Sequence, residues 1–263
     1  IFVEKMNGGI EMKYVRFEFQ SVVSYGILAD ERIQVLQGDL FDQPVVSEQS
    51  VGLSDVRLMA PCEPSKAVCI GLNYRDHAEE MKHDLPKEPL FFLKPSSSLN
   101  DPAGEIRYPA ISQNVHHEAE LAVVIGKTAK HIKAANAYDY VFGYTCANDV
   151  TARDIQKSDG QWTRGKGFDT FMPIGPWIET ELDPHTLDIK GSVNGQLRQS
   201  SNTKNLIFRI PELIEFVTQV MTLYPGDVIL TGTPSGVGPM EVGDTVTVEI
   251  AGIGALTNKI VAD

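Results

Sequence analysis

HHEAELAVVIG, residues 116–126, carries the clearest structural signal in the chain. Its period-2 alternation is typical of a β-strand. Residues i and i+2 of a strand point to the same face. Glu118 and Glu120 are therefore expected to project side by side, while the residues between and beyond them face a core, namely Ala119, Leu121, Val123 and Ile125.

Two adjacent carboxylates need compensation if they are buried. They repel each other, and burying them unpaired is costly. A hard divalent cation would relieve that cost, because Mg²⁺ and Mn²⁺ prefer oxygen ligands. The alternative is a strand with a solvated acidic face, which an isolated Glu-x-Glu favours. The pair therefore indicates a metal site only in combination with further ligands.

Asp149 is a candidate third ligand, in the run YTCANDVTARD. It is expected at the end of a strand and before a helix, where side chains reach the rim of a sheet. An alternative role is the N-cap of that helix, since aspartate is favoured there. Asp139 and Asp154 are chemically equivalent candidates, so spacing alone does not select among the three.

His77 and Glu80 form a candidate acid–base pair. Positions i and i+3 share a helix face, so the carboxylate could polarise the imidazole for general base catalysis. Many charged neighbours fit a solvated helix face equally well, and the residues alone favour that reading. His116 and His117 lack the spacing of a zinc site, which favours a structural or supporting role.

Several basic and amide side chains could bind an anionic substrate. Lys94 follows an apolar run, and Lys166 lies in a glycine-flanked segment where it could stabilise an enolate. Arg153 and Gln156 are one helical turn apart and could bind a carboxylate. The alternative for each is an ordinary solvated surface side chain.

The composition narrows the class of protein. The 263 residues are 42% hydrophobic with a net charge of -12, which indicates a globular chain and argues against nucleic acids and anionic membranes as partners. No apolar run approaches the ~20 residues of a membrane span. The three cysteines lie among apolar residues, and no signal-peptide pattern opens the chain, so a reducing cytoplasmic location is expected. Residues 1–11 precede Met12, a plausible natural start, and resemble an upstream extension.

The residue pattern indicates a β-dominated α+β fold with two parts. We expect a small β-rich N-terminal domain over residues 1–60, with a turn at Ala29-Asp30-Glu31, and a catalytic domain over 61–263. In the second part we expect strands at 66–71, 90–94 and 117–125, a β-rich run at 138–149, and a hairpin at 187–199 through Asn194-Gly195. Helices are expected at 74–84, where Asn73 is the cap, at 151–158 and at 210–223. Residues 159–175 are expected to form an irregular loop.

Seven motifs in this order resemble the fumarylacetoacetate hydrolase superfamily, and most closely its acylpyruvase and oxaloacetate decarboxylase branch. They are GLNYRDHAEE, LFFLKP, HHEAELAVVIG, NDVTARD, WTRGKGFD, VNGQLRQ and LTGTPSGVGP, and the resemblance covers about residues 66–260. It implies a mixed β-sandwich roll and one Mg²⁺ or Mn²⁺, bound by Glu118, Glu120 and Asp149.

The resemblance also implies roles for the other candidates. Lys166 matches the family lysine, and His77 with Glu80 matches a base pair carried on a lid helix. The positions that match the substrate pocket are Arg153, Gln156, Thr233 and, with a less defined role, Lys94.

The implied activity is cleavage of a C–C bond in a small 2-oxo acid through a pyruvate enolate, by acylpyruvate hydrolysis, oxaloacetate decarboxylation or both. We also expect a homodimer. One alternative is an isomerase or decarboxylase of aromatic catabolism, acting on 2-hydroxyhepta-2,4-diene-1,7-dioate or 5-oxopent-3-ene-1,2,5-tricarboxylate. The other is a non-catalytic scaffold in which the carboxylates serve stability alone.

Overall fold

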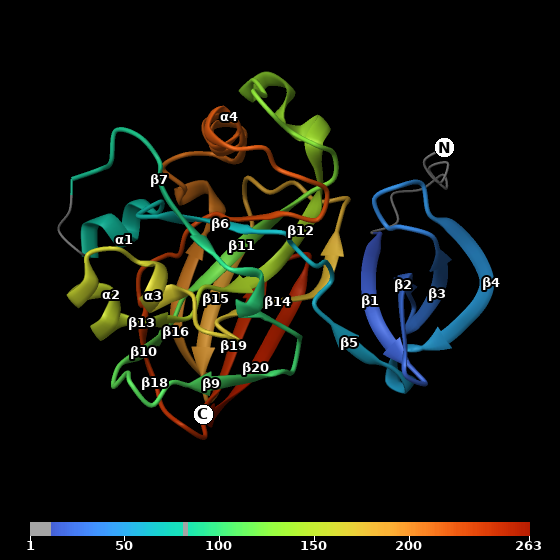
Figure 1. The fold of residues 1–263 in the computed structure, drawn as a ribbon, viewed down its shortest axis with the longest axis horizontal. Helices are drawn as coiled ribbons and strands as arrows, with labels where there is room; N and C mark the ends of the chain where they lie inside the picture. The colour runs from blue at the N-terminus through green and yellow to red at the C-terminus, as the bar shows by residue number, and fades with distance from the viewer. Residues whose placement is uncertain (1–11, 81–83) are drawn as a thin grey trace.

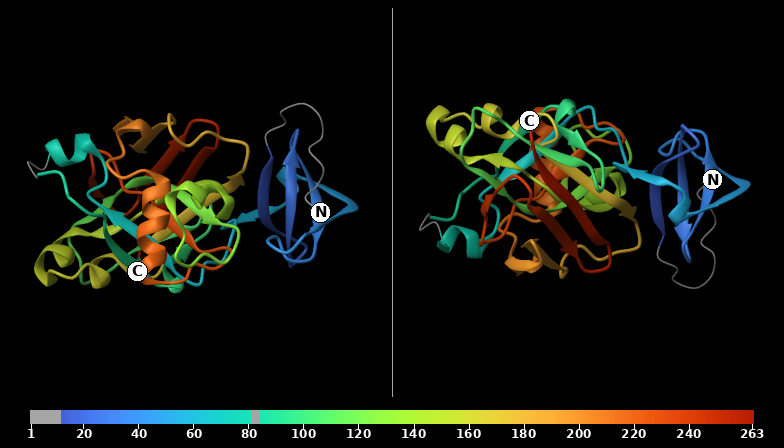
Figure 2. Two further views of the ribbon diagram at one scale, coloured as in Figure 1. Left: turned by 90° about the horizontal axis from the view of Figure 1, so that it is seen from above. Right: turned by 90° about the horizontal axis from the view of Figure 1, so that it is seen from below.

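The computed structural model describes residues 12–80 and 84–263, and within them the chain has the expected β-rich α+β architecture. Figure 1 shows a small lobe of strands β1–β4 beside a larger lobe. Both views in Figure 2 place helices α1 and α2 at the end of the larger lobe that lies away from β1–β4. The expected extension at residues 1–11 lies outside the described residues.

The small lobe is an antiparallel meander. Its strands are β1 (Lys13–Phe19), β2 (Val22–Ala29), β3 (Arg32–Gln37) and β4 (Val45–Gly52). Asp30 and Glu31 adopt positive φ between β2 and β3, so the predicted turn is confirmed. β5 (Arg57–Met59) pairs with β1 and leads toward the larger lobe. A domain boundary at residue 60 stays a prediction.

The central sheet of the described chain has the order β4-β3-β2-β1-β14-β12-β11-β17-β6-β7, with β5 and β8 attached at its side. Its further strands are β6 (Ala67–Gly71), β7 (Leu90–Lys94), β8 (Leu99–Asn100), β11 (Ala119–Ile125), β12 (Val141–Asn148), β14 (Met172–Glu179) and β17 (Val228–Leu230). The strands predicted at 66–71 and 90–94 are confirmed as β6 and β7.

Two smaller sheets complete the larger lobe. One contains β9 (Glu105–Tyr108), β15 (Asp188–Val193), β16 (Gln196–Asn202), β19 (Thr245–Ile250) and β20 (Gly254–Ala262). The other contains β10 (Val115–His117), β13 (Thr151–Ala152) and β18 (Gly238–Met240). Asn194 and Gly195 both have positive φ between β15 and β16, which confirms the predicted hairpin.

The described helices are α1 (Arg75–Glu80), α2 (Arg153–Asp159), α3 (Thr163–Lys166) and α4 (Ile210–Val220). α4 confirms the predicted amphipathic helix, and none of these helices is long and apolar enough to cross a membrane. The predicted loop at 159–175 was wrong in part, because it contains α3 and the start of β14. The β-rich run expected from residue 138 begins instead with a 3-10 segment, Ala134–Tyr140.

The cap predicted at Asn73 and the alternative role of Asp149 as a cap are both wrong. Asn73 is buried, and its Oδ1 accepts from the backbone N–H of Phe208 at 2.8 Å, while α1 begins only at Arg75. The N-cap position of α2 is Ala152, so Asp149 does not cap that helix. Part of the helix predicted at 74–84 lies outside the described residues.

The predicted acidic strand consists of two strands, since β10 ends before Glu118 and β11 begins after it. One face of β11 packs in the predicted core through Leu121 and Val123. The opposite face, which a solvated strand would expose, packs in a second core through Ala122 and Val124. The solvated alternative is therefore wrong, because β11 lies in the middle of the sheet between β12 and β17.

Candidate active site

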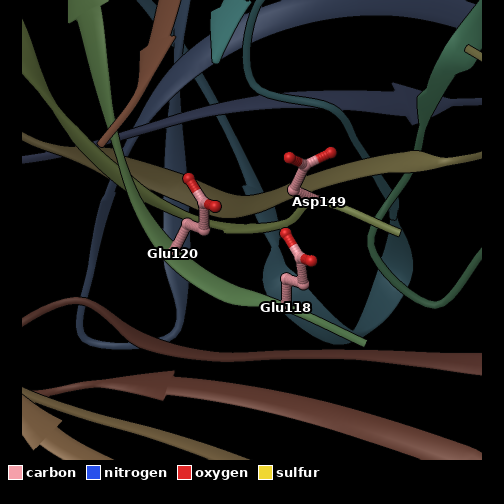
Figure 3. Close-up of side chains that lie close together, drawn as sticks. All are labelled: Glu118, Glu120 and Asp149. Carbon is pink, nitrogen blue, oxygen red and sulfur yellow. The ribbon is translucent and has the colours of Figure 1, made fainter. Parts of the chain in front are cut away.

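Three buried carboxylates converge where β11 meets β12. Ala119 in β11 pairs with Asn148 in β12, which brings Asp149 opposite Glu118. One carboxylate oxygen from each of Glu118, Glu120 and Asp149 lies within 4.8 Å of the others. Figure 3 shows the three side chains lying close together. Their exposed fractions are 5%, 1% and 1%, so water compensates little of their charge.

Lys166 and Arg153 neutralise Glu118 on both of its oxygens. Lys166 Nζ lies 2.7 Å from Glu118 Oε2 and also 2.7 Å from Asp149 Oδ2. Arg153 Nη2 donates to Glu118 Oε1. Glu120 differs, because its Oε2 accepts from the backbone N–H of Gly232, at 2.8 Å, and it has no ion-pair partner among the described residues.

These contacts set the ionisation of the cluster. Burial raises the pKa of Glu118, but Lys166 and Arg153 outweigh it and hold that pKa below its usual value. Burial lowers the pKa of Lys166, but Asp149 and Glu118 reverse the effect and raise it, so the ammonium keeps its proton. The pKa of Glu120 is well above its usual value because of burial and the charges of Asp149 and Glu118.

The donor set fits a divalent cation. Its ligand atoms are all carboxylate oxygens, which Mg²⁺ and Mn²⁺ favour. Burial and the charges of Asp149 and Glu118 raise the pKa of Glu120, and a bound cation would offset both effects. The cluster is thus a possible divalent metal site.

A cavity of about 580 Å³ opens onto this cluster. Nine of the ten predicted site residues lie in its wall: His77, Glu80, Glu118, Glu120, Asp149, Arg153, Gln156, Lys166 and Thr233. Apolar side chains complete the wall, among them Phe92 and Trp162, whose rings meet edge to face at 5.2 Å. A wall that combines polar and apolar side chains is typical of a small-molecule site.

His77 is buried in the cavity wall, with 9% of it exposed, so the solvated-face alternative is wrong for this residue. Its Nδ1 lies 3.2 Å from Glu80 Oε2, as the spacing on α1 predicts. The carboxylate of Glu80 also accepts from the backbone N–H of Gly236, at 3.3 Å from each oxygen. These two contacts give His77 and Glu80 a defined position in the cavity wall.

Lys94 is the predicted residue that the cavity wall does not include. It is fully buried, and its Nζ lies 2.6 Å from Asp149 Oδ1 and 3.0 Å from the carbonyl of Val150. This geometry suits holding the side chain of Asp149 in place. Arg153 and Gln156 bond to each other at 2.7 Å, as their spacing on α2 allows.

The remaining candidates lie elsewhere or act indirectly. Asp154 binds Ser112 Oγ at 2.7 Å, and Asp139 is exposed, so Asp149 is the aspartate that joins the cluster. His116 lines the cavity, with Nε2 2.9 Å from Asn114 Oδ1. Burial and Arg153 lower the pKa of His116 to about 4, which keeps its ring neutral at neutral pH.

Two further groups contact the cluster segments without having been predicted: the side chain of Gln199, which accepts from the N–H of Ala119 at 2.9 Å, and the backbone N–H of Gly232. Gln199 lies in the quoted motif VNGQLRQ, and Gly232 in LTGTPSGVGP, but neither residue type signals a site by itself. Gly232 acts through its N–H, which no side-chain pattern reveals.

Comparison with protein families decides the classification. Residues 66–261 match the family model described as fumarylacetoacetate (FAA) hydrolase, C-terminal. The chain belongs to the fumarylacetoacetate hydrolase family. Residues 12–61 match a second model, described as Rv2993c-like, N-terminal. The fold class predicted from the sequence is thus confirmed, including the N-terminal β part.

Three relatives illustrate the range of this likeness. Protein Rv2993c of Mycobacterium tuberculosis is 51% identical over 224 residues, 84% of each chain. The rat mitochondrial oxaloacetate tautomerase Fahd2a is 48% identical over 79% of this chain and 70% of its own length. The crystal structure of 2-hydroxyhepta-2,4-diene-1,7-dioate isomerase from Mycobacterium marinum has a TM-score of 0.90 at 44% identity, covering 96% of this chain and 99% of that one.

These findings refine the resemblance seen in the sequence. The superfamily is confirmed, and the chain is an enzyme of this family with an acidic site suited to a metal ion. Two of these three relatives have names that state an activity, a tautomerase and an isomerase, whereas the motifs favoured the acylpyruvase and oxaloacetate decarboxylase branch. The reaction itself is therefore a matter for proposal.

Proposed function

We propose that this enzyme forms the enolate of a small 2-oxo acid and cleaves a C–C bond in it, by acylpyruvate hydrolysis or oxaloacetate decarboxylation. One observation carries the proposal: three buried carboxylates, two of them bridged by Lys166, line the same cavity as the His77–Glu80 pair. The site thus combines a place for a cation, a fixed positive charge and a candidate base.

In this proposal, Glu118, Glu120 and Asp149 hold Mg²⁺ or Mn²⁺. When bound, that ion supplies Lewis acidity toward the oxygens of the 2-oxo acid. Lys94 keeps Asp149 in place through its 2.6 Å contact. Arg153 and Gln156 line the cavity beside Glu118 and can orient the substrate carboxylate, and Thr233 contributes to the cavity wall.

Lys166 places positive charge where the enolate oxygen develops. Its raised pKa keeps it protonated at neutral pH, and 2% exposure keeps bulk water from weakening its field. Electrons from the broken C–C bond pass to this oxygen, so the charge favours the transition state more than the ground state.

His77 acts as the general base in hydrolysis. Glu80 at Nδ1 orients the ring, which leaves Nε2 to take a proton from the attacking water. Decarboxylation needs no water attack, because CO₂ departs and the enolate is then protonated. Hydrolysis should therefore depend on His77 more strongly than decarboxylation does.

A second candidate is proton transfer without bond cleavage. The relatives named oxaloacetate tautomerase and 2-hydroxyhepta-2,4-diene-1,7-dioate isomerase favour it, at 48% and 44% identity. Both reactions interconvert keto and enol or dienol forms of a 2-oxo diacid, so they would use the same enolate and the same base. The two candidates differ in whether the enolate is formed by cleavage or by deprotonation.

The experiment follows acetylpyruvate, oxaloacetate and 2-hydroxyhepta-2,4-diene-1,7-dioate separately by NMR with purified protein. EDTA should abolish turnover, and Mg²⁺ or Mn²⁺ should restore it. Appearance of pyruvate at an enzyme-dependent rate supports cleavage. Accelerated tautomer or isomer exchange without pyruvate supports the second candidate. Full activity in stringently metal-free protein overturns the metal site, and no turnover of any substrate favours the scaffold alternative.

Light scattering tests the expected homodimer, and fractionation of cells that express the native chain tests the expected cytoplasmic location.

A further inference from the structure

Gln199 in β16 is fully buried and uses both ends of its amide. Its Oε1 accepts from the backbone N–H of Ala119 at 2.9 Å and lies 3.0 Å from His117 Nδ1. Its Nε2 donates to Thr233 Oγ1 at 2.8 Å and to the carbonyl of Pro234 at 2.9 Å. A backbone N–H can only donate and a carbonyl can only accept, so these contacts determine which end of the amide is oxygen.

A glycine makes room for this amide. Gly191 in β15 is the cross-strand partner of Gln199. A Cβ at that position would lie 2.8 Å from Gln199 Oε1 and 3.3 Å from the Cβ of Ala119. The absence of a side chain at Gly191 therefore lets Gln199 reach across β15 to the start of β11.

The two segments that Gln199 joins both carry site residues. Ala119 lies between Glu118 and Glu120, so its position helps to set both carboxylates. Residues 232–236 form a loop that contacts the site at each end. The N–H of Gly232 donates to Glu120 Oε2 at 2.8 Å, and the N–H of Gly236 lies 3.3 Å from both oxygens of Glu80.

We propose that Gln199 is a positioning residue that holds the start of β11 against the 232–236 loop, and that it thereby sets the affinity of the carboxylate cluster for a divalent cation and seats Glu80. Thr233 reinforces the contact, since its hydroxyl donates to the carbonyl of Ala119 at 2.9 Å. Without the bridge, the bonds of Thr231 and Thr233 to β11 would remain, but the loop would be held less firmly against Glu120. The inference rests on the metal site of the proposed function.

The test compares Gln199→Met with a matched control, Asn258→Leu. Asn258 lies in β20 of the same sheet, is 2% exposed, and donates to the carbonyls of Asp101 and Gly104 at 3.0 and 2.9 Å. Each change deletes a buried amide that bridges backbone groups, so both should lower the melting temperature. Only Gln199→Met should weaken Mn²⁺ binding, by ~10–100-fold, as is usual for residues that orient metal ligands.

Mn²⁺ affinity is measured by titration calorimetry, and amide hydrogen exchange at Gly232 and Gly236 is measured by NMR. Gln199→Met should accelerate exchange at both glycines, while Asn258→Leu should not. If Gln199→Met does not fold, Gln199→Asn replaces it, because one methylene less withdraws the amide by ~1.5 Å. A folded Gln199 variant that binds Mn²⁺ as tightly as the wild type overturns the inference alone. A wild type that does not bind Mn²⁺ overturns the proposed metal site as well.

Discussion

Lys94 Nζ lies 2.6 Å from Asp149 Oδ1, although 55 positions separate the two residues in the sequence. Both side chains are almost completely buried, at 0% and 2% exposed. A buried charge is tolerated when it is paired and hydrogen-bonded. The pair therefore links the end of β7 to the aspartate that follows β12, and it helps to hold one ligand of the candidate metal site.

Replacing Lys94 by Met should strongly destabilise the protein. Removing one partner of a buried ion pair typically costs ~3–5 kcal/mol. Without Lys94, Lys166 is the remaining cation beside Asp149 and must also compensate Glu118, so negative charge is left in excess. Urea denaturation of metal-free protein measures the effect. The double variant Lys94→Met/Asp149→Asn should recover part of the loss, because it removes the stranded charge. Equal stability of Lys94→Met and wild type would contradict the contact.

Replacing Glu120 by Gln should stabilise the metal-free protein and abolish metal binding. Folding raises the pKa of this carboxyl, so the folded protein binds its proton more tightly than the unfolded chain does. The carboxyl then lowers stability progressively as pH rises above the unfolded value of ~4.3. The amide of the Glu120→Gln variant does not ionise, so the variant avoids that loss of stability, and the amide oxygen can still accept from the N–H of Gly232. The melting temperature of the variant minus that of wild type should be near zero at low pH and positive at pH 7; a negative difference at pH 7 would refute the argument.

Replacing His77 by Ala should reduce acylpyruvate hydrolysis by ~10²–10⁴-fold, the usual cost of losing general base catalysis. Decarboxylation of oxaloacetate should fall much less. Glu79→Ala is the matched control, because Glu79 is exposed on the same helix and should be dispensable. Parallel initial-rate measurements on both substrates separate the outcomes. Unchanged hydrolysis in a folded His77→Ala protein would exclude it as the base.

Replacing Lys166 by Met should lower kcat together with kcat/KM on every substrate, because all the candidate reactions pass through the enolate. The change keeps much of the side-chain bulk and deletes the charge. Arg164→Met, on the exposed side of the same short helix, is the control. Steady-state kinetics with saturating Mg²⁺ decide the question, and wild-type rates in the Lys166 variant would place its role in stability alone.

Local patterns in the sequence predicted those features that depend on near neighbours. The turn at Asp30 and the hairpin at Asn194-Gly195 follow from residues that tolerate positive φ. The contact of His77 with Glu80 follows from their i, i+3 spacing on one helix. Membership of the family follows from ordered motifs, which together carry more information than any one of them.

The tertiary structure decided what depends on the order of the strands. Alternation in β11 predicted which residues share a face, but only the position of β11 between β12 and β17 buries both faces and makes the charge of Glu120 costly. The contacts of Lys94 with Asp149 and of Gln199 with Ala119 span 55 and 80 positions. Such contacts arise from strand pairing between distant segments, and the local periodicity of a sequence does not encode that pairing.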